Sequence, residues 1–273
     1  MVCVTSVKPN GTCGPYTYPN ITSSGVNGNT TSVGNNMFTG ATGYAASTQT
    51  LTVTSPGDWQ VVANLPAGDT DVTSYPSLGQ YYGPGAAGYP LSHWSAFYSS
   101  FNETMNQVSG TSAEAAYDIW FSTTTGFNEV MIQHDIVNRG TSTTLATVSF
   151  GGNYGVPVHN WNLSVVNREI IWQLADDGGN LRVGSVDILA MLLWLENNPY
   201  AGGAPYLPAS ANMYLIGYGW EICSTNGGNE TFQVNSFSMT DVAAGPGPGP
   251  GPSPVTEGAV NTALLWGTST RCC

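Results

Sequence analysis

The sequence predicts an all-β domain built as a sandwich. Many short runs rich in Val, Ile, Thr, Tyr, Phe and Trp are separated by clusters of Gly, Asn, Pro and Ser, at the spacing typical of a sandwich or barrel. Hydrophobic residues make up 41% of the chain, which is enough to fill a core and argues against disorder. The expected strands cover residues 49–54, 59–64, 115–121, 129–135, 145–150, 157–166, 169–175, 213–223 and 231–240.

One segment, 185–198, departs from this pattern and predicts a helix. It is rich in helix-forming residues, with Ser185 as the expected N-cap and Pro199 directly after its end. We expect this helix to pack on the outside of the sandwich. Its apolar stripe consists of Ile188, Met191, Leu192 and Leu195.

The charge balance excludes several classes of partner. Charged residues make up 8% of the chain, where an ordinary soluble domain carries about 25%. Five Lys and Arg residues against 17 Asp and Glu residues give a formal net charge of −12. So few cations cannot build a basic patch for nucleic acid, and the acidic balance disfavours an anionic membrane surface. A neutral polar ligand fits best.

The cysteines and the end of the chain define its organisation. Cys3 and Cys13 can close a short loop, and no cysteine spacing fits a zinc site. Residues 245–254 alternate Gly and Pro, which predicts an extended linker between a domain at 1–244 and a tail at 255–273. We interpret the tail as a truncated module or an expression remnant. The chain lacks an apolar signal run, and we expect a secreted protein whose signal peptide is not present in this chain.

The first candidate site segment is the expected strand 115–121. Alternation places Asp118 and Trp120 on one face and the apolar residues between them on the other. An indole offers a flat face to sugar C–H groups, and a carboxylate accepts hydrogen bonds from hydroxyls. This pairing is typical of a sugar-binding surface; the alternative is a solvated strand face with an incidental Trp.

The second segment is the expected strand 129–135. Period two places Glu129, Met131, Gln133 and Asp135 on one face. Glu is depleted in strands, so Glu129 among apolar neighbours needs a reason. A carboxylate held on a rigid strand can act as a nucleophile; the alternative is a glutamate on a sheet face in water.

The third segment is 213–223, in which Glu221 shares a face with Gly217 and Gly219. Glycines beside a carboxylate predict open space above the sheet for a ligand. The neighbouring Trp220 and Ile222 favour partial desolvation, which keeps a general acid protonated. The alternative is a strand glutamate paired with a nearby Arg. Two glutamates on separate strands fit glycoside hydrolysis, which uses two carboxyl groups across the scissile bond.

At these residues the chain resembles glycoside hydrolase family 12, the compact endo-β-1,4-glucanases and xyloglucanases. The resemblance covers roughly residues 30–242 and rests on an ordered set of motifs. These are Asn35-Asn36-Met37-Phe38, Tyr75-Pro76-Ser77, Ala116-Tyr117-Asp118-Ile119-Trp120, Asn128-Glu129-Val130-Met131-Ile132, Gly219-Trp220-Glu221 and Val234-Asn235-Ser236-Phe237-Ser238.

The resemblance implies a β-jelly roll sandwich of two antiparallel sheets, with a substrate cleft on the concave face and one α-helix packed on the convex face. It also implies retaining hydrolysis, with Glu129 as the nucleophile, Glu221 as the acid/base and Asp118 assisting. Met131 matches the methionine beneath the reacting sugar.

The resemblance also implies which other residues contact the substrate. Phe38 stands where the family usually has Trp, and Gln133 stands where it often has Trp. Both are expected in the cleft. Tyr75, Trp120 and Trp220 are further candidates for aromatic contacts with the substrate.

The expected function is therefore a retaining endo-β-1,4-glucanase, or cellulase, acting on cellulose or mixed-linkage β-glucan. We expect it to be a monomer with a β-glucan polysaccharide as its partner and no metal or cofactor. The alternatives are a xyloglucan-specific endoglucanase of the same family and a non-catalytic carbohydrate-binding jelly roll. A xylanase is disfavoured by the Asn-Glu-x-Met-Ile and Gly-Trp-Glu motifs.

Overall fold

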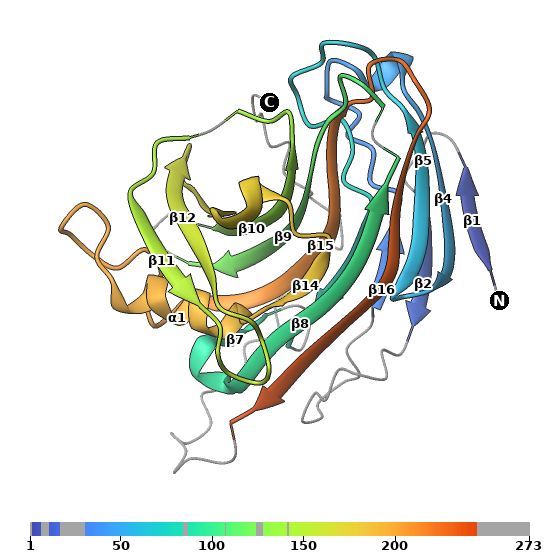
Figure 1. Cartoon of the computed structure of the whole chain (residues 1–273). Helices are drawn as coiled ribbons and strands as arrows, with labels where there is room; N and C mark the ends of the chain where they lie inside the picture. Colours follow the sequence, from blue (N-terminus) through green and yellow to red (C-terminus); the bar gives the residue numbers. More distant parts are fainter. Residues whose placement is uncertain are drawn as a thin grey trace.

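Two β-sheets pack face to face in the computed structural model (Figure 1). The structure describes residues 2–6, 11–16, 31–83, 87–106, 108–123, 128–140 and 142–244. The expected linker at 245–254 and tail at 255–273 lie outside the described residues. Within the described part, the prediction of an all-β sandwich with one α-helix is confirmed.

Sheet A has six strands, and its long central strands β8 and β16 pair along most of their lengths. In spatial order the strands are β1 (Cys3–Ser6), β4 (Thr48–Ser55), β5 (Asp58–Asn64), β16 (Glu230–Ala243), β8 (Trp94–Met105) and β14 (Val183–Val186).

Sheet B has ten strands and carries the residues of interest on β10, β9 and β15. Its order is β11 (Ala146–Phe150), β12 (His159–Val166), β13 (Glu169–Leu174), β10 (Glu129–Val137), β9 (Ser112–Ser122), β15 (Asn212–Ser224), β6 (Ser77–Tyr81), β3 (Thr31–Gly34) and β2 (Thr12–Tyr16). The short strand β7 (Tyr89–Pro90) pairs with β15. Among the described strands, β10 and β13 form a parallel pair inside a sheet that is otherwise antiparallel.

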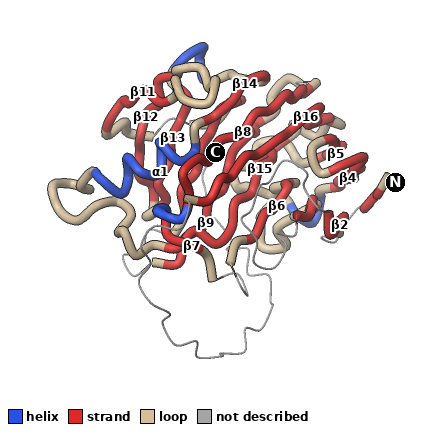
Figure 2. The backbone as a smooth tube through the Cα atoms, turned by 90° about the horizontal axis from the view of Figure 1, so that it is seen from below, coloured by secondary structure: helices blue, strands red, loops and turns tan. Residues whose placement is uncertain are grey.

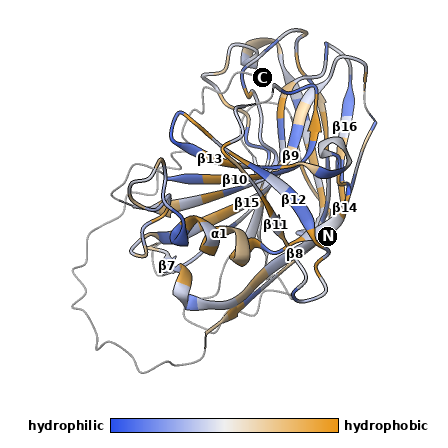
Figure 3. Cartoon of the chain, turned by 60° about the vertical axis from the view of Figure 1, so that its left-hand side comes forward, coloured by the Kyte–Doolittle hydropathy of each residue, from blue (hydrophilic) through white to orange (hydrophobic). Residues whose placement is uncertain are grey.

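The core lies between the two sheets and is rich in aromatic residues. Trp59 and Phe232 of sheet A meet Tyr117, Trp172 and Trp220 of sheet B in one cluster of buried side chains. Hydrophobic and hydrophilic residues alternate along the strands (Figure 3), because successive side chains of a strand point to opposite faces. This alternation is what lets each sheet bury one face and keep polar residues on the other.

The helix α1 (Ile188–Asn197) follows β14 directly (Figure 2). The described residues contain this one α-helix. Asp187 caps it, since its Oδ1 accepts a hydrogen bond from the Ala190 amide at 3.1 Å. The prediction of Ser185 as the N-cap was therefore wrong by two residues, because Ser185 still pairs with Ser100 in sheet A. The helix lies against β8 of sheet A and contacts sheet B through an edge-to-face pair between Trp194 and Trp172.

Short elements complete the described fold. The described residues include the 3-10 turns η1 (Tyr44–Ala46), η3 (Leu91–His93) and η4 (Asp176–Gly179). Cys3 and Cys13 form a disulfide. Across the described residues, no helix has the length and hydropathy needed to cross a membrane.

Candidate active site

The face of sheet B that points away from sheet A carries four buried carboxyl side chains. Ala116, Met131 and Ile171 form a small buried cluster on this face, separate from the main core. Asp118 lies opposite Met131 in the β9–β10 pair, so the two side chains share this face. We call it the acidic face and define it by Glu114, Asp118, Glu129 and Glu221.

The four carboxyl groups are almost excluded from water. Glu129 is 5% exposed, Asp118 is 4% exposed and Glu221 is 2% exposed. Acidic side chains are rarely buried to this degree without partners or a chemical role. This burial excludes the alternative of ordinary solvated strand faces for Asp118 and Glu129.

Strand β9 separates the two candidate catalytic glutamates. Glu129 on β10 lies opposite Trp120, and Glu221 on β15 lies opposite Glu114. Asp118 occupies an intermediate position on β9. The two glutamates therefore lie on the strands at either side of β9 and face different positions along it. Asp118 lies between those two positions.

The pKa of Tyr75 is affected by three of these carboxyl groups, those of Asp118, Glu129 and Glu221. Its buried hydroxyl donates a hydrogen bond to the Ala116 carbonyl at 3.2 Å, on the central strand β9. Burial raises the pKa of Tyr75 well above its usual value, and the charges of Asp118, Glu221 and Glu129 raise it further. Three acids from three strands therefore act on one hydroxyl, which stays protonated.

Tyr75 also fills space that the sequence predicted to be open. A Cβ added to Gly217 would lie 3.1 Å from the Tyr75 hydroxyl oxygen, and one added to Gly219 would collide with the Pro76 carbonyl oxygen. The prediction of empty space above these glycines was wrong. The glycines instead admit the segment before β6 against the sheet.

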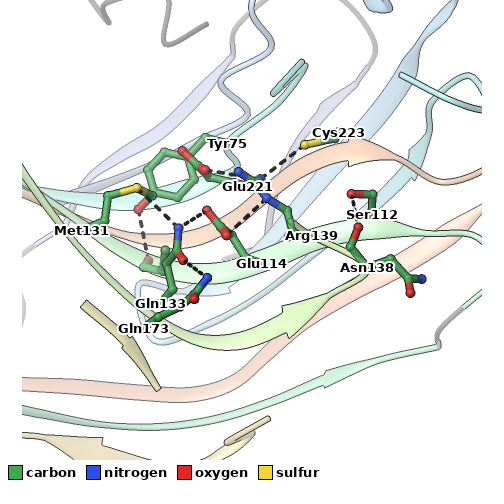
Figure 4. Close-up of polar contacts among 11 residues, drawn as sticks. Tyr75, Ser112, Glu114, Met131, Gln133, Asn138, Arg139, Gln173, Glu221 and Cys223 are labelled. Atoms are coloured by element: carbon green, nitrogen blue, oxygen red, sulfur yellow. Dashed lines mark hydrogen bonds and ion pairs between the residues drawn. The ribbon is translucent and has the colours of Figure 1, made fainter. Parts of the chain in front are cut away.

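Gln133 holds the acidic face together through its amide. Its Nε2 donates to Glu114 Oε1 at 2.8 Å, and its Oε1 accepts from Gln173 Nε2 at 3.0 Å. The same Nε2 lies 3.8 Å from Met131 Sδ. Gln133 is 3% exposed, so at this position a polar link between strands replaces the indole expected from the family resemblance (Figure 4).

Glu221 is paired with Arg139, as the alternative interpretation of this strand allowed. Nη1 of Arg139 lies 3.6 Å from Glu221 Oε2, and its Nε lies 3.3 Å from Glu114 Oε2. Figure 4 shows the guanidinium lying between the two carboxyl groups. The cation favours the ionised form of each glutamate.

Two residues predicted for this face lie on the other side of the sheet. Trp220 is fully buried in the main core, where it packs against Phe232 of sheet A, so it does not line the acidic face. Asp135 turns toward sheet A and pairs with Arg182 at 2.8 Å. A β-bulge between Gln133 and Asp135 breaks the period-two alternation there.

The other aromatic candidates have mixed positions. Trp120 is half-buried and lies opposite Glu129. Phe38 is half-buried, and its amide donates to the Thr73 carbonyl at 2.8 Å in the loop that leads to Tyr75. Tyr75 is buried beside the carboxyl groups.

Sequence reasoning missed Glu114, Arg139 and Gln173. Glu114 has the same parity as Asp118 on β9, so alternation already carried a signal for it. Arg139 follows the end of β10 and carries no periodic signal. Among the described residues, no group of His, Cys, Asp or Glu is arranged to hold a metal ion.

Comparison with known proteins identifies the fold. No protein-family model matches the sequence, and no curated protein matches it. Similar solved structures include the native family 12 xyloglucanase from Bacillus licheniformis, with a TM-score of 0.65 and 18% identity over 88% of this chain and 100% of that chain. The xyloglucanase domain of NopAA, a type three effector from Sinorhizobium fredii, in complex with cellobiose, has a TM-score of 0.63 and 21% identity over 88% of this chain and 98% of that chain.

A third similar structure is the catalytic domain of Humicola grisea Cel12A in complex with a soaked thio cellotetraose. Its TM-score is 0.60 and its identity 20%, over 77% of this chain and 92% of that chain. The chain therefore has the β-jelly roll fold of glycoside hydrolase family 12, as the resemblance implied.

Proposed function

We propose that this chain, which has the fold of glycoside hydrolase family 12, is a retaining endo-β-1,4-glucanase. The observation that carries the proposal is the burial of Glu129, Asp118 and Glu221 on one face of sheet B, where the charges of all three raise the pKa of Tyr75. Glycoside hydrolysis needs two carboxyl groups that act on one glycosidic bond. The cellobiose and thio cellotetraose in two of the similar structures support a β-1,4-linked glucoside as the substrate class.

In the first step, Glu221 donates its proton to the glycosidic oxygen while a Glu129 carboxylate oxygen attacks the anomeric carbon. The C–O bond to the leaving chain breaks, and a covalent glycosyl-enzyme forms. The near-complete burial of both side chains strengthens their interaction with charge that develops on the sugar.

In the second step, water attacks the anomeric carbon and passes its proton to Glu221, and the bond to Glu129 breaks. The product keeps the configuration of the substrate because two inversions have occurred. Asp118 lies on β9, next to the strand that carries Glu129. Its carboxyl group assists because the protonation states of two neighbouring carboxyl groups depend on each other.

The test is hydrolysis of barley β-glucan and carboxymethylcellulose, followed by reducing-end release and by proton NMR of the first anomer formed. We expect new reducing ends within the chain and initial appearance of the β-anomer. Glu129→Gln and Glu221→Gln should each lose at least about 1,000-fold in turnover on β-glucan while keeping the wild-type melting curve. Full activity in either variant, or initial appearance of the α-anomer, overturns the proposal.

A glucosyl fluoride or a dinitrophenyl β-cellobioside separates the two roles. These leaving groups depart without a proton, so Glu221→Gln should keep glycosylation while Glu129→Gln should not. A carbohydrate-binding module on the same fold would instead bind β-glucan in both variants and release no sugar.

Xyloglucan is the second candidate substrate, because two of the similar structures are described as xyloglucanases. The ratio of kcat/KM on tamarind xyloglucan to that on barley β-glucan decides between the two substrates.

A further inference from the structure

Arg139 lies between two carboxyl groups that face each other across the β9–β15 pair. Glu114 and Glu221 are direct partners in that pair, and the guanidinium approaches an oxygen of each at 3.3 and 3.6 Å. The Arg139 side chain is 6% exposed, so the three charges interact with little screening by water. Arg139 also donates to Cys223 Sγ at 3.3 Å, two residues beyond Glu221.

The backbone around Arg139 is anchored to the start of β9. Asn138 has a positive φ of 51°, and its Nδ2 donates to the Thr111 carbonyl at 2.8 Å. Ser112 Oγ in turn donates to the Asn138 carbonyl at 3.2 Å. These bonds hold the end of β10 against β9. They restrain the backbone beside Arg139, and with it the position of the guanidinium next to Glu221.

Glu114 makes a hydrogen bond in addition to its ion pair with Arg139. Glu114 accepts a hydrogen bond from the Gln133 amide, which favours its ionised form. An ionised Glu114 offsets the charge of Arg139. This matters for Glu221, because an unopposed cation would hold it as a carboxylate, and a general acid must first carry a proton.

We propose that Arg139 and Glu114 act as an opposed pair of positioning residues, which orients Glu221 and sets the pH at which Glu221 loses its proton. The inference rests on the proposed function. The other groups that face this site are Asp118 on β9, Glu129 on β10 and the Tyr75 hydroxyl before β6. None of these three changes in the variants below.

The test is the pH dependence of kcat/KM on β-glucan for Arg139→Gln and Glu114→Gln. The alkaline limb of this profile reports loss of the proton from the acid. Removing the cation should move that limb to higher pH, and removing the opposing carboxylate should move it to lower pH, each by about one pH unit. Arg139→Lys should keep the wild-type limb, because it keeps the charge, while kcat falls with the loss of the forked geometry.

Arg182→Gln is the matched control, because it removes an arginine–carboxylate pair from the opposite face of the same sheet. It should leave the limb in place even if the melting temperature falls. Shifts of the same sign in both test variants, or no shift in either, overturn the inference. If Arg139→Gln does not fold, the downward shift in Glu114→Gln and its absence in Arg139→Lys still decide the matter.

The same experiment separates this inference from the proposed function. If Glu221→Gln hydrolyses β-glucan at the wild-type rate, the proposed function fails. If Glu221→Gln is inactive and the alkaline limbs of Arg139→Gln and Glu114→Gln shift in the same direction, the proposed function stands and only the role of Arg139 and Glu114 fails.

Discussion

The ring of Tyr75 packs directly on the backbone of Gly217. A Cβ at this glycine would lie 3.1 Å from the tyrosine oxygen and 3.2 Å from a ring carbon. The close approach lets the hydroxyl reach the Ala116 carbonyl on the neighbouring strand. The absence of a side chain at Gly217 on β15 thus allows the Tyr75 hydroxyl to lie within the electrostatic influence of Asp118, Glu129 and Glu221.

Gly217→Ala is expected to lower kcat on β-glucan by about tenfold or more with a modest loss of stability. The new methyl group pushes Tyr75 by a few tenths of an ångström, and small displacements beside reacting groups are costly. Gly79→Ala is the matched control, since Gly79 lies opposite Gly217 on β6 and an added Cβ would meet only Leu215 at 3.8 Å. Equal activity in the two variants contradicts a role for the packing of Tyr75.

Gln133→Leu is expected to destabilise the protein by about 1–3 kcal/mol and to reduce activity. The substitution leaves a buried oxygen of Glu114 and the half-buried amide of Gln173 without the side chain that now joins them. Urea denaturation and initial rates on β-glucan measure the two effects. Gln173→Leu removes only one of these bonds, from a half-buried position, and should cost less than Gln133→Leu.

Trp120 and Trp220 are expected to respond differently to replacement by Leu. Trp220→Leu should lower the free energy of unfolding by about 3 kcal/mol, because it empties part of the core beside Phe232. Its KM should stay close to that of the wild type. Trp120→Leu should raise KM by about fivefold through loss of about 1 kcal/mol of stacking. A raised KM in Trp220→Leu alone contradicts the placement of the two indoles.

Glu103→Gln is expected to stabilise the protein increasingly as the pH rises. Burial of Glu103 in sheet A raises its pKa well above 4.5, although the hydrogen bond that Tyr218 donates to its Oε2 at 2.8 Å opposes this shift. The folded chain then keeps a proton that the unfolded chain releases above about pH 4.5. Wild-type stability therefore falls with rising pH, by at most about 1.4 kcal/mol per unit, and the glutamine variant lacks this loss.

Urea denaturation of both proteins between pH 5 and pH 7 measures the difference. His134, whose pKa burial lowers to about 4, gives the opposite slope below its ordinary value of 6.5, because the unfolded chain binds the extra proton there. His134 Nδ1 lies 3.6 Å from Glu103 Oε1, so the measured difference also includes the interaction between these two side chains. A difference that is constant with pH contradicts a raised pKa for Glu103.

Alternation along single strands predicted much of the acidic face. Asp118, Glu129, Met131, Gln133 and Glu221 lie on it as expected, since the side-chain period of a strand is set by the backbone alone. Trp220 directly precedes Glu221, so the same rule predicts that its side chain points to the opposite face, where the main core lies. The interpretation of Trp220 as a substrate contact went against that rule and was wrong.

Local periodicity failed where two strands had to fit each other. The bulge before Asp135 turns that carboxyl toward Arg182, 47 residues away, and the alternation gives no sign of it. Likewise, the space above Gly217 looks open along one strand, but Tyr75 from a distant segment fills it.

The sequence by itself determined that this chain forms a β-sandwich and that Asp118, Glu129 and Glu221 lie on the face opposite the apolar residues of their strands, because both follow from the pattern of neighbouring residues. Only the tertiary structure decided which acids share an environment and which cation lies beside Glu221. Those outcomes depend on strand order and register, which bring Tyr75 and Arg139 from separate segments to one face. Contacts between residues so far apart in the chain leave no periodic trace in the sequence.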